Sequence, residues 1–235
     1  GPPSFQKNEL ETDAISIWSL PSTGATSGNT RIPGNTFRYQ RTEYLITAAE
    51  MAASNFPVGQ EINSIGFLVG TAGATTQSGT FTVYLKNTSD VAYSLGTSWD
   101  ITGFTKVSEI ANWTVPIAAG SYEVPFSGGS TFTYTGGGVY VAWEFSNPSG
   151  TLGTTALGAL WNLNMTGGLM GQRSSTSMPT TLVASNWRPA TIFGNNFYTD
   201  VVQVTNIYTL ERNPIPYGAP TPVDVRVANV SAAPA

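Results

Sequence analysis

The chain has 235 residues, which is enough for one large all-β domain or for one domain and part of another. Only 10% of the residues are charged and the net charge is -4, so the clustered positive charge that nucleic-acid binding requires is missing. The sequence contains neither histidine nor cysteine, which excludes disulfides, thiolate metal sites and the common histidine-assisted nucleophiles.

The composition also bears on location. No apolar stretch of about 18 residues is present, so we expect no membrane span, and no signal peptide is visible, as in a mature exported protein. A surface of Ser, Thr, Asn and Gly with few charges favours the extracellular space or the cell surface.

In chain order, the predicted elements are short strands separated by polar turns. Alternating apolar residues predict a first strand near residues 15–20 and a half-buried strand over residues 80–86. Between them, residues 41–46 and 61–69 are strand-like. Residues 47–53, TAAEMAA, instead favour a short helical turn.

The second half continues the same pattern. Residues 113–117 alternate, and residues 120–126 predict an edge strand because Pro125 cannot donate to a ladder. The run VYVAWEF at residues 139–145 predicts a central strand, and residues 188–194 predict a late one.

These elements predict an all-β fold, a jelly-roll-like, two-sheet antiparallel β-sandwich with one helical turn near residues 47–53. A pair of immunoglobulin-like domains with a boundary near residue 105 is the alternative. The predicted sandwich spans residues 1–212, and the four prolines of residues 213–222 indicate a stiff linker. Residues 223–235 then form the first strand of a following module, a free tail or a strand exchanged between copies.

Tryptophans near loops are the candidate ligand-binding residues, because exposed aromatic faces stack on sugar rings. The alternative for each is packing in the core or at an interface. The four candidates are Trp99, Trp113, Trp161 and Trp187.

A structural Ca²⁺ ion is the only cofactor that the sequence suggests. Glu9, Glu11 and Asp13 alternate along the chain, so in a strand all three point to one face, and Ca²⁺ binds oxygen ligands. The alternative is a charged edge near the N-terminus. Asp90 and Asp100 form a second, similar candidate. Carboxylates that could serve glycoside hydrolysis, such as Glu43 and Glu144, occur in no recognisable catalytic signature, so we predict that the chain is not an enzyme.

One segment carries a family resemblance. RTEYLITAAEM at residues 41–51, followed by INSIGFLV at residues 62–69, resembles a β-sandwich module of large secreted proteins of Bacteroidota and related bacteria. The later segments FTVYLKNTS, VYVAWEF and NWRPATIF are similar to strands of that module, and NPIPYG is similar to its linkers. The resemblance implies a non-catalytic, extracellular module of a multidomain surface protein.

Three functions follow as predictions. The first is a structural or adhesive module whose partner is a glycan or a protein on an external surface. The second is a carbohydrate-binding module that uses exposed tryptophans. The third is a subunit of an extracellular filament, in which a terminal strand joins the sheet of another copy.

Overall fold

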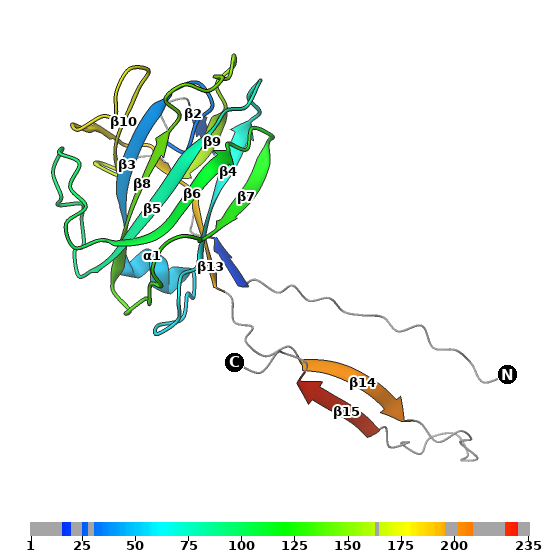
Figure 1. Ribbon diagram of the computed structural model, residues 1–235. Coiled ribbons are helices and arrows are strands. Elements are labelled where there is room, and N and C mark those ends of the chain that lie inside the picture. The colour runs from blue at the N-terminus through cyan, green and yellow to red at the C-terminus, as the bar shows by residue number, and fades with distance from the viewer. Residues whose placement is uncertain are drawn as a thin grey trace. The chain divides into compact units, whose positions relative to one another are not determined.

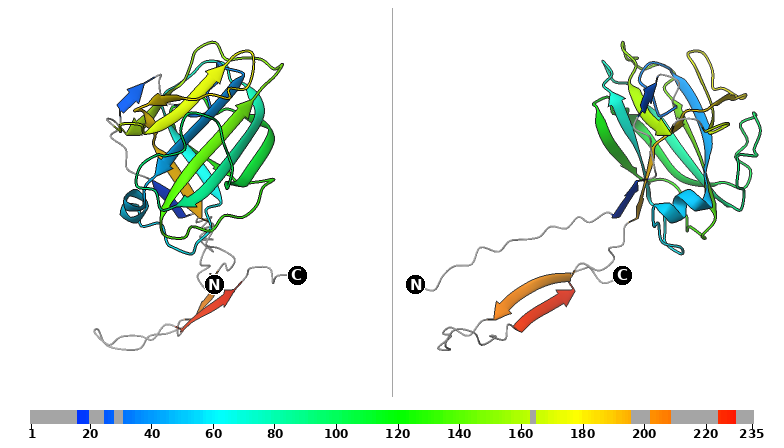
Figure 2. Two further views of the ribbon diagram at one scale, coloured as in Figure 1. Left: turned by 90° about the vertical axis from the view of Figure 1, so that its left-hand side faces the viewer. Right: turned by 180° about the vertical axis from the view of Figure 1, so that it is seen from behind.

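Strands from all parts of the sequence between residues 16 and 195 assemble into two antiparallel sheets that face each other in the computed structural model (Figures 1 and 2). The structure describes residues 16–19, 25–27, 31–162, 165–195, 202–208 and 224–229. Most consecutive strands lie in different sheets, and the two facing antiparallel sheets confirm the predicted β-sandwich.

The first sheet has six strands in the order β11-β10-β3-β8-β5-β6. Their bounds are β3 Tyr39–Ile46, β5 Ser78–Thr88, β6 Thr105–Thr114, β8 Gly138–Ser146, β10 Leu169–Ser174 and β11 Val183–Ser185. The predicted central strand is therefore β8, which pairs with β3 on one side and β5 on the other.

The second sheet has seven strands, with the order β1-β13-β4-β9-β12 and with β2 beside β9 and β7 beside β4. Their bounds are β1 Ser16–Ser19, β2 Ala25–Ser27, β4 Ser64–Thr71, β7 Gly120–Pro125, β9 Gly158–Asn162, β12 Arg188–Pro189 and β13 Thr191–Asn195. Strand β7, which ends at Pro125, pairs with β4 alone among the described residues, as expected for an edge strand.

The core lies between the sheets and follows the two-residue period of the strands. In the six-stranded sheet, the inward side chains include Tyr44, Val83, Val141 and the fully buried Trp143. Phe67 and Phe193 meet them from the seven-stranded sheet. Because alternate residues point to opposite faces, the residues between these in β3, β5 and β8 form an outer face.

A single turn of helix, α1 Ala48–Ala53, closes one end of the sandwich, as predicted. Thr47 caps it, since its side chain accepts from the backbone amide of Glu50 while the Glu50 carboxylate accepts from the amide of Thr47. Met51, its buried residue, packs into the core and anchors the helix there.

Strand β6 differs from the expectation that alternation begins at Trp113. It runs from Thr105 to Thr114, so only the first two of residues 113–117 lie in it. Its pairing with β5 shifts register twice, between Gly79 and Phe81 and between Val83 and Tyr84. Each shift inserts a residue into the ladder and interrupts the two-residue period, which hides the strand from pattern reading.

Strands β14 Val202–Tyr208 and β15 Asp224–Asn229 pair with each other in a separate unit of the chain. The predicted domain boundaries at residues 212 and 223 stay predictions. Within the residues that the structure describes, there is no helix of the length and apolarity needed to cross a membrane.

Candidate functional site

Aromatic and charged side chains gather on the outer face of β3, β8 and β5, the face that the left panel of Figure 2 views. Cross-strand register arranges them in three rows, Arg41–Glu144–Thr82, Glu43–Ala142–Tyr84 and Leu45–Tyr140–Lys86. Two carboxylates, two cations and two phenols thus share one patch of sheet. The small Ala142 at its centre leaves room for side chains from above.

The loop between β5 and β6, residues 89–104, crosses this face, and we call it the strap loop. Its second half is tied to the segment before β11. The backbone amide of Trp99 donates to the Thr180 carbonyl at 3.0 Å, and the amide of Leu182 donates to the Thr97 carbonyl at 2.6 Å. These bonds fix the strap loop to the edge of the sheet.

The first half of the strap loop is held by β8. The Tyr140 hydroxyl donates to Asp90 Oδ2 at 2.6 Å and accepts from the backbone amide of Ser94 at 3.0 Å. Hydrogen bonds from Ser94 and Tyr140 lower the pKa of Asp90 below its usual value. Asp90, one of the weaker metal candidates, is therefore engaged in holding the loop.

Trp99 stands over the sheet with its ring braced from beneath. The guanidinium of Arg41 lies 4.6 Å from the ring centroid, and the Tyr84 ring meets it edge-on at 6.1 Å. Arg41 is itself fixed, because it pairs with Glu144 at 2.8 Å and donates to the Pro179 carbonyl at 2.9 Å. Trp99 is half-buried, so part of its ring stays accessible in a preorganised position.

Glu43 lies in the next row and is fully buried beneath the strap loop, at 0% exposure. The Tyr93 hydroxyl is 2.9 Å from Glu43 Oε2, whereas Glu43 Oε1 has no hydrogen-bond partner within the described part of the chain. Burial raises the pKa of Glu43 to about 7. Hydrogen bonds from the Tyr93 hydroxyl and the Asp100 backbone amide and the charge of Arg41 oppose the rise, and the Asp100 carboxylate adds to it.

Glu43 and Glu144 are the two carboxylates that sequence reasoning considered for glycoside hydrolysis, and the structure brings them onto neighbouring strands. Neither is presented to a substrate in this arrangement. Glu43 is fully buried, and the Glu144 oxygens accept from Arg41 at 2.9 Å and from Tyr84 at 3.2 Å. Both carboxylates are therefore covered or engaged by neighbouring residues.

The other predicted tryptophans lie elsewhere. Trp113 stacks on Phe81 with ring centroids 4.5 Å apart and packs against the core. Trp187 is half-buried in the turn between β11 and β12. Trp161 lies in β9, where its backbone pairs with Ala25 and Pro189. Trp99 is thus the one of the four that the described structure joins to the outer-face cluster.

The calcium prediction falls outside the description, because Glu9, Glu11 and Asp13 are not among the described residues. Across the parts of the chain that are described, no group of three or more Asp, Glu, His or Cys side chains could hold a metal ion. Asp100 accepts from the backbone amide of Thr102 at 2.9 Å and belongs to the strap loop.

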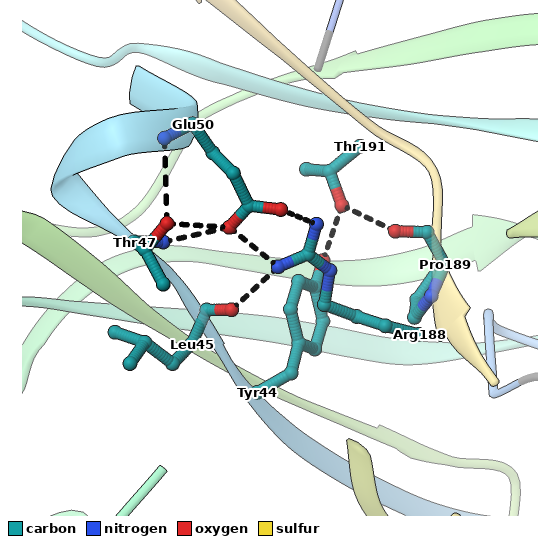
Figure 3. A network of polar contacts seen from close by, with 7 residues as sticks. All are labelled: Tyr44, Leu45, Thr47, Glu50, Arg188, Pro189 and Thr191. Carbon is teal, nitrogen blue, oxygen red and sulfur yellow. Dashed lines mark hydrogen bonds and ion pairs between the residues drawn. The ribbon is translucent and has the colours of Figure 1, made fainter. Parts of the chain in front are cut away.

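A second polar network is buried at the corner beside α1 (Figure 3). Arg188 is 1% exposed and forms a bidentate ion pair with Glu50, while its Nη1 also donates to the Leu45 carbonyl at 2.7 Å. Tyr44 shares a hydrogen bond with Thr191 at 2.8 Å in the same corner. This network joins α1 to β12 and β13, which makes it structural. The partners are 138 residues apart in the chain, and no local pattern reveals them.

No family model and no curated protein matches the chain. Among solved structures, the chain is similar to the cysteine protease and lectin-like domains of Cwp84, a surface layer associated protein of Clostridium difficile. The identity is 9% and the TM-score 0.37, over 67% of this chain and 32% of that one. This chain therefore spans about a third of the length of that structure. A similarity at this level carries no argument about fold or function, which rest on the geometry above.

Proposed function

We propose that this chain is a non-catalytic binding module of an extracellular or cell-surface protein, and that it adheres to external partners through the strap loop. The observation that carries the proposal is that neighbouring side chains hold the ring of Trp99 in place. Arg41 lies 4.6 Å behind its ring, and the loop is tied on both sides of it. A rigid aromatic side chain loses little conformational entropy on binding, which is how binding surfaces gain affinity.

The low charge of the chain supports an external location. Charged residues make up 10% of the sequence, and two of the charged groups of the outer face, Arg41 and Glu144, neutralise each other in an ion pair. Adhesion to a surface without long-range electrostatic steering fits such a face. The resemblance to secreted modules of Bacteroidota points the same way and stays a prediction.

Carbohydrate is the ligand class that Trp99 favours. Sugar rings present apolar C–H faces that stack on indole, and their hydroxyls need hydrogen-bond partners near the ring. The polar side chain against the Trp99 ring is that of Arg41, which is 18% exposed. The second candidate function is therefore a carbohydrate-binding module centred on Trp99.

The test is a glycan panel followed by titration of tryptophan fluorescence and calorimetry. We expect at least one polysaccharide to bind, Trp99→Ala to abolish binding, and Trp99→Phe to retain part of the binding enthalpy while losing the fluorescence response. Trp113→Phe is the matched control, because that ring packs on Phe81, and it should bind as wild type does. A flat response across the panel would exclude the carbohydrate candidate. Unchanged capture of external surfaces by Trp99→Ala would refute the role of the strap loop.

The filament function is less favoured by the strand pairing. Strand β15 already pairs with β14 of the same chain over residues 202–208 and 224–229, so an exchanged strand would have to replace that pairing. Light scattering of the full chain and of a deletion of residues 221–235 tests this directly. Polymers that vanish on deletion would favour the filament over adhesion.

A further inference from the structure

We propose that Glu43 is a proton-operated latch of the strap loop: neutral Glu43 completes a hydrogen-bond chain that holds the loop on the sheet, and loss of its proton to solvent releases the loop. The inference goes beyond the proposed function and does not depend on it, because the movement of the loop is measurable without any ligand.

The hydrogen-bond chain runs from β3 into the strap loop. The Tyr93 hydroxyl lies 2.9 Å from Glu43 Oε2 and 3.1 Å from the Gly96 carbonyl. A phenol has one hydrogen to donate, so it cannot donate to both oxygens at once. When Glu43 carries a proton on Oε2, it donates to Tyr93 and Tyr93 donates to Gly96. Both hydrogens of the chain then have an acceptor, and the Gly96 carbonyl keeps its donor.

Ionisation breaks this arrangement. The single Tyr93 hydrogen must then serve the Glu43 carboxylate, and the Gly96 carbonyl loses its donor. The second carboxylate oxygen, Oε1, has no hydrogen-bond partner among the described residues and is buried with the charge. A buried, incompletely paired charge is costly, and the nearest relief is hydration after the loop lifts. The strap loop is thus stable over neutral Glu43 and strained over its anion.

The ionisable groups around Glu43 come from its own strand and from each element packed on it. They are Arg41 of β3, Tyr84 and Lys86 of β5, Tyr140 and Glu144 of β8, and Asp90, Tyr93 and Asp100 of the strap loop. On β10 its register partner is the uncharged Met170.

Among these groups, Glu43 is the one whose charge we expect to change near neutral pH. Hydrogen bonds from Ser94 and Thr102 lower the pKa values of Asp90 and Asp100, so both stay ionised at neutral pH. Burial raises the pKa values of Tyr84, Tyr93 and Tyr140, so these phenols stay neutral. Glu144 is held by Arg41 at 2.8 Å. Burial, by contrast, brings the pKa of Glu43 to about 7.

Linkage gives the size of the effect. If Glu43 regains its ordinary pKa of 4.5 when the loop lifts, against about 7 when it is closed, the opening constant rises with pH between those two values. Between pH 5.5 and pH 7.5 the rise is about 20-fold. Closure is therefore favoured in acid, and opening is favoured as the solution becomes alkaline.

Hydrogen exchange followed by mass spectrometry measures the opening. Peptides covering residues 89–104 and 179–183 contain the amides of Ser94, Trp99 and Leu182, which tie the loop down. After correction for the intrinsic pH dependence of exchange, we expect their protection to fall about 20-fold from pH 5.5 to 7.5, while the amides of β8 keep theirs.

Four variants separate the latch from general destabilisation. Glu43→Gln imitates the neutral acid and should keep the amides of the strap loop protected from exchange at every pH. Tyr93→Phe cannot donate a hydrogen bond to the Gly96 carbonyl, so the same amides should already exchange faster at pH 5.5. Asp100→Asn removes a neighbouring charge that raises the pKa of Glu43, so the midpoint should move to lower pH. Glu109→Gln alters an exposed carboxylate paired with Lys106 and should behave as wild type.

Three results would overturn the proposal: constant protection of the strap loop in wild type, a loss in Glu43→Gln equal to that of wild type, or a parallel loss in β8. The last outcome would place the pH effect on the whole sandwich rather than on the loop.

Discussion

Breaking the Glu50–Arg188 ion pair should lower the free energy of unfolding more than most other single substitutions in helix α1 would. Glu50→Ala leaves the Arg188 guanidinium, 1% exposed, without its carboxylate. The same substitution removes the acceptor for the Thr47 amide at 2.9 Å and opens the capping box of α1. A single substitution therefore acts on the buried charge and on the helix together.

The magnitude follows from the burial of the two partners. Removing one member of a buried pair costs about 3 to 5 kcal/mol, and loss of a helix cap costs about 1 kcal/mol. The Glu50 side chain is 19% exposed, so water recovers part of the charge, and we expect about 4 kcal/mol for Glu50→Ala. Arg188→Met should cost a similar amount, because it leaves the Leu45 carbonyl without its donor as well as the carboxylate unpaired.

Urea unfolding of the two single variants and the double variant gives the coupling. Once both charges are gone no unpaired ion remains, so the double variant should be more stable than the sum of the single effects predicts, by about 2 kcal/mol. The exposed pair Lys106–Glu109, at 44% and 49% side-chain exposure, is the matched control and should lose less than about 1 kcal/mol. Additive single effects, or a loss below 1 kcal/mol for Glu50→Ala, would refute this account of the corner.

Three further predictions concern the sandwich itself. Trp113→Ala removes a ring stacked 4.5 Å from Phe81 and should lower the free energy of unfolding by about 3 to 5 kcal/mol, measured by chemical denaturation; a loss below about 1 kcal/mol would contradict its place against the core. Gly79→Ala would set a Cβ 2.3 Å from the Ser146 carbonyl oxygen in the β5–β8 ladder. We therefore expect the free energy of unfolding to fall by about 3 kcal/mol, or the variant to fail to fold. A melting temperature equal to that of wild type would show that the strands are not so close. The folded pKa of Glu43 is raised from 4.5 to about 7, so its contribution to stability is complete below pH 4.5 and is lost as pH rises to 7. The free energies of unfolding at pH 5 and pH 8 should therefore differ by about 2.5 kcal/mol more in wild type than in Glu43→Gln, and equal pH profiles would exclude this source.

The acidic limb of stability should come from a different carboxylate. Burial acts to raise the pKa of Glu50, but hydrogen bonds and the charge of Arg188, with the help of Thr47, lower it overall below 4.5. Its contribution is therefore present above pH 4.5 and is lost as pH falls through the lowered value, the opposite of Glu43. Together, Glu43 and Glu50 favour maximum stability in mildly acidic solution.

The sequence by itself determined the features that depend on near neighbours. Alternation of apolar residues indicated the strands and the all-β class, and the apolar run at residues 139–145 indicated a central strand, whose Trp143 is 0% exposed. The helical turn at residues 47–53 was equally local, because Thr47 and Glu50 cap each other three residues apart. Side-chain period and capping act within a few residues, so they can be read without the fold.

Only the tertiary structure decided which of these residues act together. Glu43 and Tyr93 are 50 residues apart, and Glu50 and Arg188 are 138 apart, so their contacts exist only once strand order and register are set. Two register shifts interrupt the two-residue period of β6 and hid most of this strand from the sequence pattern. The assembled sheets also place Trp113 against the core and Trp99 on the outer face beside Arg41. Burial beneath a loop is what changes Glu43 from an ordinary surface carboxylate into a group that titrates near neutrality, and burial is a property of the assembled sheets rather than of the local sequence.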